Sequence, residues 1–440
     1  MKNNFFTLIF IFFALNACTK TDKVTILAHK VSVSNTDQGM KLIVDGKDFM
    51  INGMNWDYFP IGTNYSYSLW EQPETFIKTA LDSEMAMLKD MGVNAIRVYT
   101  SMQPKWITYV YEKYGIYTMI NHSFGRYGLS INGKWIPVTD YSNLDAQKVL
   151  LQEVSEMTET YKDTPGLLLF LLGNENNYGL FWEGAETENF PSDEKEIVAK
   201  GEQLGRPMYR LMNKAAKIIK TIDGLHPVAI CNGDIGFIDI IAEECIDVDI
   251  YGTNMYRGKS FGDAFERIKK ELNMPIMFTE FGADAFDALE NKEDQKMQAF
   301  YMVENWKEIY ENAAGLGKIG NSIGGFTFQF SDGWWKFEQT RNLEVQDNNA
   351  SWVNGGYDFD FKKGSNNMNE EWFGICAKGP RNEKGFYKLY PRAAYYALKE
   401  VHQLKPYSDG LTLEYISEYF SNINIKSAFL KGQKNKYSLN

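Results

Sequence analysis

Two short apolar runs that each lead into a glutamate constrain this chain more than any other feature. The first run, Leu167–Leu172, has six apolar residues without alternation and leads into Asn174 and Glu175. The second run, Pro275–Phe278, leads into Glu280. Such runs predict strands that are buried on both faces, as in parallel sheets. We therefore expect two glutamates at the carboxyl ends of parallel strands, where α/β enzymes hold their catalytic groups.

A pattern of strand, loop and amphipathic helix repeats along most of the chain. Eight strands are expected, at 52–56, 93–99, 116–121, 167–172, 226–231, 248–253, 275–280 and 323–330. The helices between and after them are expected at 73–91, 104–114, 144–161, 202–222, 237–244, 261–272, 290–312 and 391–404. Eight alternating units in 440 residues predict an α/β fold with a single (β/α)₈ TIM barrel.

Smaller elements are expected at both ends of this barrel. Alternating strands around Asp45-Gly46 predict an N-terminal β-hairpin over 41–51, which we expect to close the barrel floor. The segment 331–390 after strand eight is a loop of about sixty residues, and loops of that length are usually functional. We therefore assign 37–404 to the catalytic barrel and 405–440 to a C-terminal extension whose packing the pattern does not predict.

The first 18 residues resemble a bacterial lipoprotein signal. Lys2 precedes an apolar run over 5–15 that is too short to span a bilayer, and Ala17-Cys18 is similar to the lipobox. The resemblance implies cleavage before Cys18, lipidation of that cysteine, and a lipid-anchored protein of the bacterial cell envelope, on its periplasmic face or at the cell surface. Residues 19–36 are polar and predict a tether. The alternative is an ordinary secretory signal.

The composition excludes several classes of partner. A net charge of -11 argues against nucleic acid, because phosphate binding needs clustered lysines and arginines. Four scattered cysteines and four histidines without ligand spacing argue against a disulfide framework and a zinc site. No metal or cofactor is therefore expected, and membrane contact is expected through the lipid anchor only.

The high aromatic content, 15% of the residues, has two explanations. Large barrels use aromatic residues in their cores, and sugar-binding clefts use flat apolar faces against pyranose rings. Five tryptophans fall in loops at one end of the predicted barrel, which favours the cleft: Trp182, Trp334, Trp335, Trp352 and Trp372. The expected partner is therefore an oligo- or polysaccharide.

The paired glutamates suit the hydrolysis of a glycosidic bond. One carboxyl group must protonate the leaving oxygen, and a second must attack the sugar or activate water. Glu175 and Glu280 would end strands four and seven, which face each other across the barrel mouth. Asn174 offers an amide that could bind the sugar's 2-hydroxyl, a contact that strengthens in the transition state.

These motifs carry a resemblance to a known class of enzymes. Gly173-Asn174-Glu175 with 279–282 resembles the clan A retaining glycoside hydrolases. The end of strand seven and the segment 91–97 are similar to the family 2 and family 72 barrels. The resemblance implies a retaining β-glycosidase in which Glu175 is the general acid/base and Glu280 is the nucleophile.

The resemblance also implies roles for residues around the glutamates. Arg97 would hold Glu280 ionised, and Asn174 would bind the 2-hydroxyl. Tyr256 would hydrogen-bond the nucleophile, with Tyr251 as the alternative. We expect the acid, Glu175, to be the less solvated carboxyl and to have a raised pKa.

Two further substrate contacts are implied, each with an alternative. Trp334 matches the tryptophan platform under the sugar, and Trp335 is the other candidate. His122 is a candidate substrate contact, although a structural role would explain it as well. The expected substrates are β-linked glucan or hemicellulose-type oligosaccharides. The alternatives are a non-catalytic surface glycan-binding lipoprotein and a β-glucan transglycosylase that uses the same residues.

Overall fold

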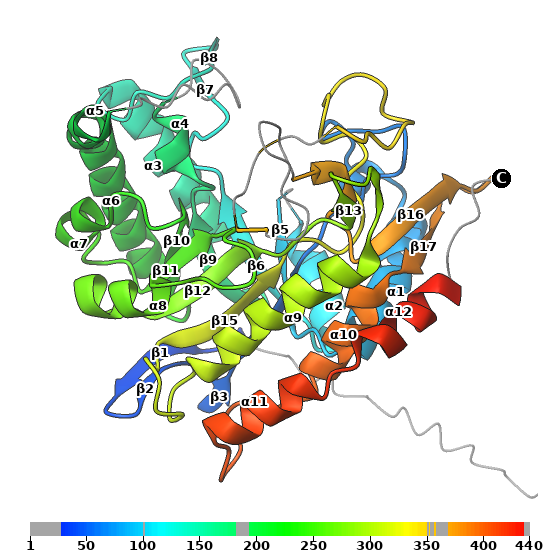
Figure 1. Ribbon diagram of the computed structural model, residues 1–440. Helices are drawn as coiled ribbons and strands as arrows, with labels where there is room; N and C mark the ends of the chain where they lie inside the picture. Colours follow the sequence, from blue (N-terminus) through cyan, green and yellow to red (C-terminus); the bar gives the residue numbers. More distant parts are fainter. Residues whose placement is uncertain are drawn as a thin grey trace, which may run out of the picture.

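Eight parallel strands close into a barrel and follow one another around it in sequence order (Figure 1). The computed structural model describes residues 28–99, 102–181, 193–349, 352, 356–357 and 368–434. The barrel strands are β4 (Ile51–Asn55), β5 (Ala95–Val98), β6 (Tyr117–His122), β9 (Leu167–Leu172), β10 (Val228–Gly233), β11 (Ile250–Asn254), β12 (Ile276–Phe281) and β15 (Ser322–Thr327). The predicted TIM barrel is confirmed, and the two apolar runs form its fourth and seventh strands.

Helices surround the barrel (Figure 1). They are α1 (Glu74–Met91), α2 (Pro104–Tyr114), α3 (Leu144–Tyr161), α6 (Arg206–Ile222), α7 (Ile238–Glu244), α8 (Ala264–Arg267), α9 (Gln295–Glu311) and α10 (Ala393–Val401). Local chemistry sets several of their ends. Pro73 precedes α1, and Gly92 closes it in the left-handed conformation with φ 87°. The Asn143 side chain caps α3 by accepting from the backbone N–H groups of Asp145 and Ala146.

A small antiparallel sheet closes the barrel floor. Its strands are β1 (Val31–Thr36), β2 (Gly39–Val44) and β3 (Lys47–Phe49), so the predicted hairpin is confirmed. Val31 and Leu42 pack in one cluster with the barrel residues Ile51 and Met277. The predicted tether is wrong over 31–36, because these residues form β1, whose apolar side chains pack against residues of the barrel floor. The signal segment, Cys18 and residues 19–27 lie outside the described residues.

Three loops contain elements of their own. A turn at Asn132-Gly133 joins β7 (Leu129–Ile131) to β8 (Lys134–Ile136). The loop after β9 contains the helices α4 (Asn176–Gly179) and α5 (Glu194–Lys200). The predicted patternless loop over 331–390 is wrong in part, because it contains the hairpin of β16 (Cys376–Arg381) and β17 (Tyr387–Pro391). Asn382 stabilises the hairpin turn by accepting from the backbone N–H of Lys384.

The helix that follows β12 begins later than expected. The short pair β13 (Phe286–Asp287) and β14 (Lys292–Glu293) precedes α9. The Asp294 side chain then caps α9 by accepting from the backbone N–H groups of Lys296 and Met297. A capping carboxylate stops a helix from extending backward, so α9 starts five residues after the predicted position at Glu290.

The C-terminal extension packs on the outside of the barrel. Its helices α11 (Leu413–Ser421) and α12 (Ile425–Lys434) lie beside α9 and α10 (Figure 1). Phe420 of α11 is 4% exposed, and its ring centroid lies 5.7 Å from that of Tyr310. Among the described residues, no helix is long and apolar enough to cross a membrane.

Phe420→Ala should lower the free energy of unfolding by about 3 kcal/mol or more, because it leaves a cavity between α11 and α9. Urea denaturation followed by circular dichroism would measure the loss. Tyr415→Ala on the same helix is the matched control, since Tyr415 is 52% exposed, and it should change stability by less than about 0.5 kcal/mol. Equal effects of the two substitutions would show that the extension does not contribute to the folded core.

Candidate active site

Both glutamates lie at the carboxyl end of the barrel, but they belong to different kinds of backbone structure, one to a strand and the other to a turn. Glu280 is still part of β12, whereas Glu175 follows β9 after a sharp turn. Gly173 in that turn has φ 86°, and Glu175 itself has φ 56° and ψ 37°. This left-handed conformation costs a non-glycine residue about 1 kcal/mol. Hydrogen bonds hold it in place, because the Glu175 N–H donates to the Cys231 carbonyl at 3.0 Å and its carbonyl accepts from the Tyr178 N–H at 3.0 Å.

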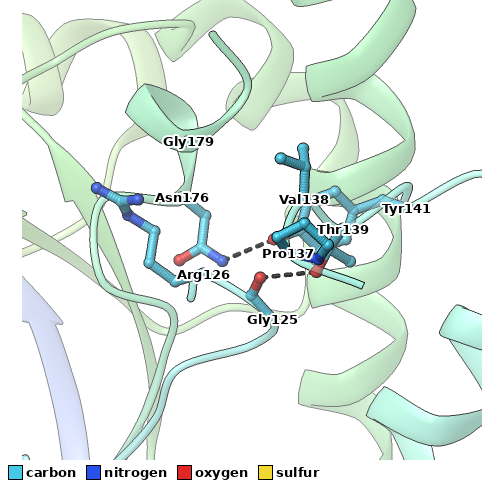
Figure 2. A pocket seen from close by; sticks show the side chains of 8 residues that line it. All are labelled: Gly125, Arg126, Pro137, Val138, Thr139, Tyr141, Asn176 and Gly179. Carbon is cyan, nitrogen blue, oxygen red and sulfur yellow. Dashed lines mark hydrogen bonds between the residues drawn. The ribbon is translucent and has the colours of Figure 1, made fainter. Parts of the chain in front are cut away.

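The buried side chain of Asn176 stabilises the turn through hydrogen bonds (Figure 2). Its oxygen accepts from the Asn174 N–H at 2.7 Å, and its amide nitrogen donates to the Phe124 carbonyl at 2.9 Å and to the Tyr141 hydroxyl at 2.8 Å. Figure 2 shows the Arg126 guanidinium pointing away from these groups, and Arg126 Nε donates to the Asn174 carbonyl at 2.9 Å. The backbone of the turn is therefore held by the Asn176 side chain of the same loop and by groups of the segment between β6 and α3.

The Arg97 guanidinium occupies the centre of the site and is fully buried. Its Nη1 lies 2.9 Å from Glu280 Oε1, and its Nη2 donates to Asn174 Oδ1 at 2.7 Å and to Asn121 Oδ1 at 2.8 Å. A buried carboxylate beside a guanidinium is favoured in its ionised form. The structure thus brings together Arg97, Asn174 and Glu280, three of the residues that the resemblance implied.

Two tyrosine hydroxyls complete the surroundings of Glu280. Tyr256 donates to Glu280 Oε2 at 3.0 Å, and Tyr99 donates toward Oε1 at 2.5 Å. Tyr251, the alternative candidate, instead donates to the Asp234 carbonyl. The sequence analysis missed Tyr99, although its position two residues after Arg97 on the same strand would have placed both side chains on one face.

Glu175 has a different environment. Its Oε1 accepts from Asn254 Nδ2 at 3.1 Å, and the orientation of that amide is set by Thr279 Oγ1, which donates to Asn254 Oδ1 at 2.7 Å. Burial raises the pKa of Glu175 to about 7, and the negative charge of Glu280 adds to the increase. The pKa of the proposed acid is therefore raised, as expected.

The expected difference in solvent exposure between the two carboxyl groups is wrong. Glu280 is 8% exposed, whereas Glu175 is intermediate in exposure. Glu280 lies within its strand, while the turn after β9 carries Glu175 toward the rim of the barrel mouth. The two groups differ mainly in their partners, because Glu280 is paired with the Arg97 guanidinium and Glu175 accepts from a neutral amide.

The structure does not bring His122 to the glutamates. Asn121 faces the barrel interior, so the next residue of β6 faces outward. The Nδ1 atom of His122 accepts from the Phe124 N–H at 3.1 Å, and its Nε2 lies 3.4 Å from Glu153 Oε2 on α3. This position fits the structural role that the sequence analysis left open.

The aromatic rings that pack on Tyr256 beside the nucleophile include Phe328, with ring centroids 6.3 Å apart, and Trp352, with ring centroids 5.2 Å apart. Trp334 follows β15 and is partly buried, and its role as the platform under the sugar stays a prediction. Trp335 packs on Phe59 instead, with centroids 5.5 Å apart. Sequence reasoning missed Phe328 because it falls inside the run assigned to strand eight.

A TIM barrel with a strand-end glutamate pair is the arrangement of a glycoside hydrolase, and comparison with known proteins supports this class. Residues 36–310 match the family described as "Glycosyl hydrolases family 2, TIM barrel domain". The match covers more than half of the chain, so the protein belongs to glycosyl hydrolase family 2. A search of curated protein sequences finds no match.

Similar solved structures have the same barrel within longer chains. A family 2 β-galacturonidase from Eisenbergiella tayi, bound to galacturonate, has 15% identity and a TM-score of 0.51 over 86% of this chain and 55% of its own. A β-glucuronidase from Bacteroides uniformis has 12% identity and a TM-score of 0.53 over 84% of this chain and 37% of its own. The chain thus spans about half the length of these proteins or less, and the likeness shows a shared fold.

Glu280→Gln should lower the pKa of Glu175 below about 7, because it removes a negative charge that helps to raise that pKa. A ¹³C NMR titration of glutamate carboxyl groups would measure it, with the Glu175 signal identified by its absence in Glu175→Gln. Glu290→Gln, at a side chain that is 65% exposed, should leave the pKa unchanged. A pKa of Glu175 that stays constant or rises in Glu280→Gln would contradict the coupling.

Proposed function

We propose that this glycoside hydrolase is a retaining β-glycosidase that cleaves β-linked glucan or hemicellulose-type oligosaccharides by double displacement. The observation that carries the proposal is the unequal environment of the two carboxyl groups. Glu280 is held between Arg97, Tyr99 and Tyr256, which stabilise a carboxylate. Glu175, with a pKa of about 7, can hold a proton near neutral pH. A retaining mechanism needs one group of each kind.

In the first step, Glu280 attacks the anomeric carbon while Glu175 protonates the leaving oxygen. The bond formed to Glu280 removes its negative charge. The pKa of Glu175 then falls, because that charge had helped to raise it. In the second step, Glu175 is therefore suited to take a proton from water, which attacks the glycosyl-enzyme and releases Glu280.

Neighbouring groups support substrate binding. Asn174 Nδ2 donates one hydrogen to the Tyr127 hydroxyl at 2.8 Å, which leaves its second amide hydrogen for the sugar's 2-hydroxyl. Aromatic side chains that follow the barrel strands are well exposed and offer flat faces to further sugar rings. They are Tyr65 (55% exposed), Tyr127 (41%) and Trp135 (57%).

The test is hydrolysis of a panel of aryl β-glycosides and β-glucans by a form that lacks residues 1–18. Glu175→Gln and Glu280→Gln should each lower kcat by a factor of about 10³ or more, whereas Glu290→Gln should match the parent. ¹H NMR should show that the first product is the β-anomer. An α-anomer, or substantial activity in Glu280→Gln, would sink the nucleophile assignment. Products longer than the substrate would instead indicate transglycosylation, and sugar binding without turnover would indicate a glycan-binding protein.

The pH profile provides a second test. The logarithm of kcat/KM should fall above about pH 7, because Glu175 must be protonated to act as the acid. The fall should weaken for 2,4-dinitrophenyl glycosides, whose leaving group needs no proton. The Glu290→Gln profile should overlay that of the parent. A high-pH limb that is the same for both leaving groups would contradict the role of Glu175.

We also propose that Cys18 carries the lipid anchor that its lipobox-like context implies, which would place the protein in the bacterial cell envelope. In a bacterial host, the full chain should fractionate with membranes and show acyl groups on its N-terminal peptide by mass spectrometry. Cys18→Ser should abolish both, and Cys231→Ser, at a buried core cysteine, should not. Membrane fractionation that survives in Cys18→Ser would contradict the proposal.

A further inference from the structure

Two opposite charges at the barrel mouth have no part in the mechanism above. Asp57 follows β4, and Lys336 follows β15, the strand that pairs with β4 in the barrel. Both residues are intermediate in exposure. The two groups therefore enter the carboxyl end of the barrel from neighbouring strands.

Lys336 stands on the same side of the site as Glu280. Its Nζ lies 5.5 Å from the ring centroid of Phe328 and 4.7 Å from that of Trp335. Phe328 packs on Tyr256, and the Tyr256 hydroxyl donates to Glu280. The charge of Glu280 also acts on the Lys336 ammonium, so a sugar that is attacked by Glu280 would lie on the Lys336 side of the site.

Neither charge has a hydrogen-bond or ion-pair partner among the residues that the structure describes. Burial raises the pKa of the Asp57 carboxyl, although Lys378 and Lys336 attract its negative charge. Burial alone would lower the pKa of Lys336, but Glu370 and Asp57 outweigh it and raise that pKa. Burial therefore disfavours the charge of Asp57, and a ligand hydroxyl that donates to this carboxylate would recover part of that free energy.

We propose that Asp57 and Lys336 together bind hydroxyl groups of the sugar whose bond is cleaved, and that they select a neutral glycone over a uronate. The inference rests on the proposed function and names its substrate class. Adjacent sugar hydroxyls can donate to the Asp57 carboxylate and accept from the Lys336 ammonium at the same time. A uronate carboxylate would satisfy Lys336 but would be repelled by Asp57, Glu370 and Glu280, whose charges all reach Lys336.

The experiment compares aryl β-glycosides of neutral sugars with the corresponding β-uronides. The parent should have a kcat/KM at least about 100-fold higher on its best neutral glycoside than on the matching uronide. Asp57→Asn and Lys336→Gln should each lower kcat/KM on the neutral substrate by about 10- to 100-fold. Lys292→Gln, at a side chain that is 60% exposed, is the control and should match the parent. A parent that prefers uronides would overturn the proposal.

Deoxy substrates separate recognition from a structural role. For one monodeoxy glycoside, the missing hydroxyl should lower kcat/KM of the parent. The same missing hydroxyl should cause no further loss in Asp57→Asn, because its partner on the protein is already gone. A second should behave in the same way with Lys336→Gln. Thermal unfolding of Asp57→Asn should occur no earlier than in the parent, since burial disfavours the charge of Asp57 in the folded protein. If the effects of the deoxy substrate and of the substitution on the logarithm of kcat/KM were simply additive, the proposal that these residues bind sugar hydroxyls would be contradicted.

Binding measurements keep this test independent of catalysis. Titration calorimetry of Glu280→Gln with the neutral sugar and with its uronic acid reports selectivity even if the protein turns over no substrate. Tighter binding of the neutral sugar, weakened by adding Asp57→Asn, would support the pair, whereas tighter binding of the uronic acid would overturn it. Failure of the proposed function would appear separately, as a lack of turnover by the parent.

Discussion

The ion pair between Arg97 and Glu280 is the interaction on which the rest of the site depends. Both groups are almost fully removed from solvent, and the loss of one partner from such a pair typically costs about 3–5 kcal/mol. The arginine also donates to Asn121 and Asn174, which stand at the ends of two other strands. One guanidinium therefore sets the geometry between strands that are remote in sequence.

The contrast between the two glutamates follows from this arrangement. The buried guanidinium of Arg97 pairs with Glu280, while Glu175 accepts from Asn254. Two similar side chains thereby acquire different hydrogen-bond partners, and burial raises the pKa of Glu175 to about 7. Asp57 and Lys336 form a second pair of opposite charges at the barrel mouth, and no described residue of the chain hydrogen-bonds to their side chains.

The elements that could be predicted were those with a strong local pattern. The run Leu167–Leu172 and the helix Leu144–Tyr161 were predicted with the bounds that the structure shows. The hairpin over 376–391 was missed, because short strands interrupted by Gly379 carry little periodicity. Residues 31–36 were predicted to be part of a tether because most of them are polar. Val31 and Val33 nevertheless pack on the apolar surface of the barrel floor.

The barrel, its strand order and the two strands that end in glutamate could be predicted from the sequence, because these depend on periodicity along the chain. Which side chains meet depends instead on how the strands and loops come together in space. Tyr256 rather than Tyr251 contacts Glu280, Phe328 rather than Trp335 packs on Tyr256, and His122 turns outward. These contacts join residues tens of positions apart, and barrel closure, which no local pattern encodes, sets the distances between them.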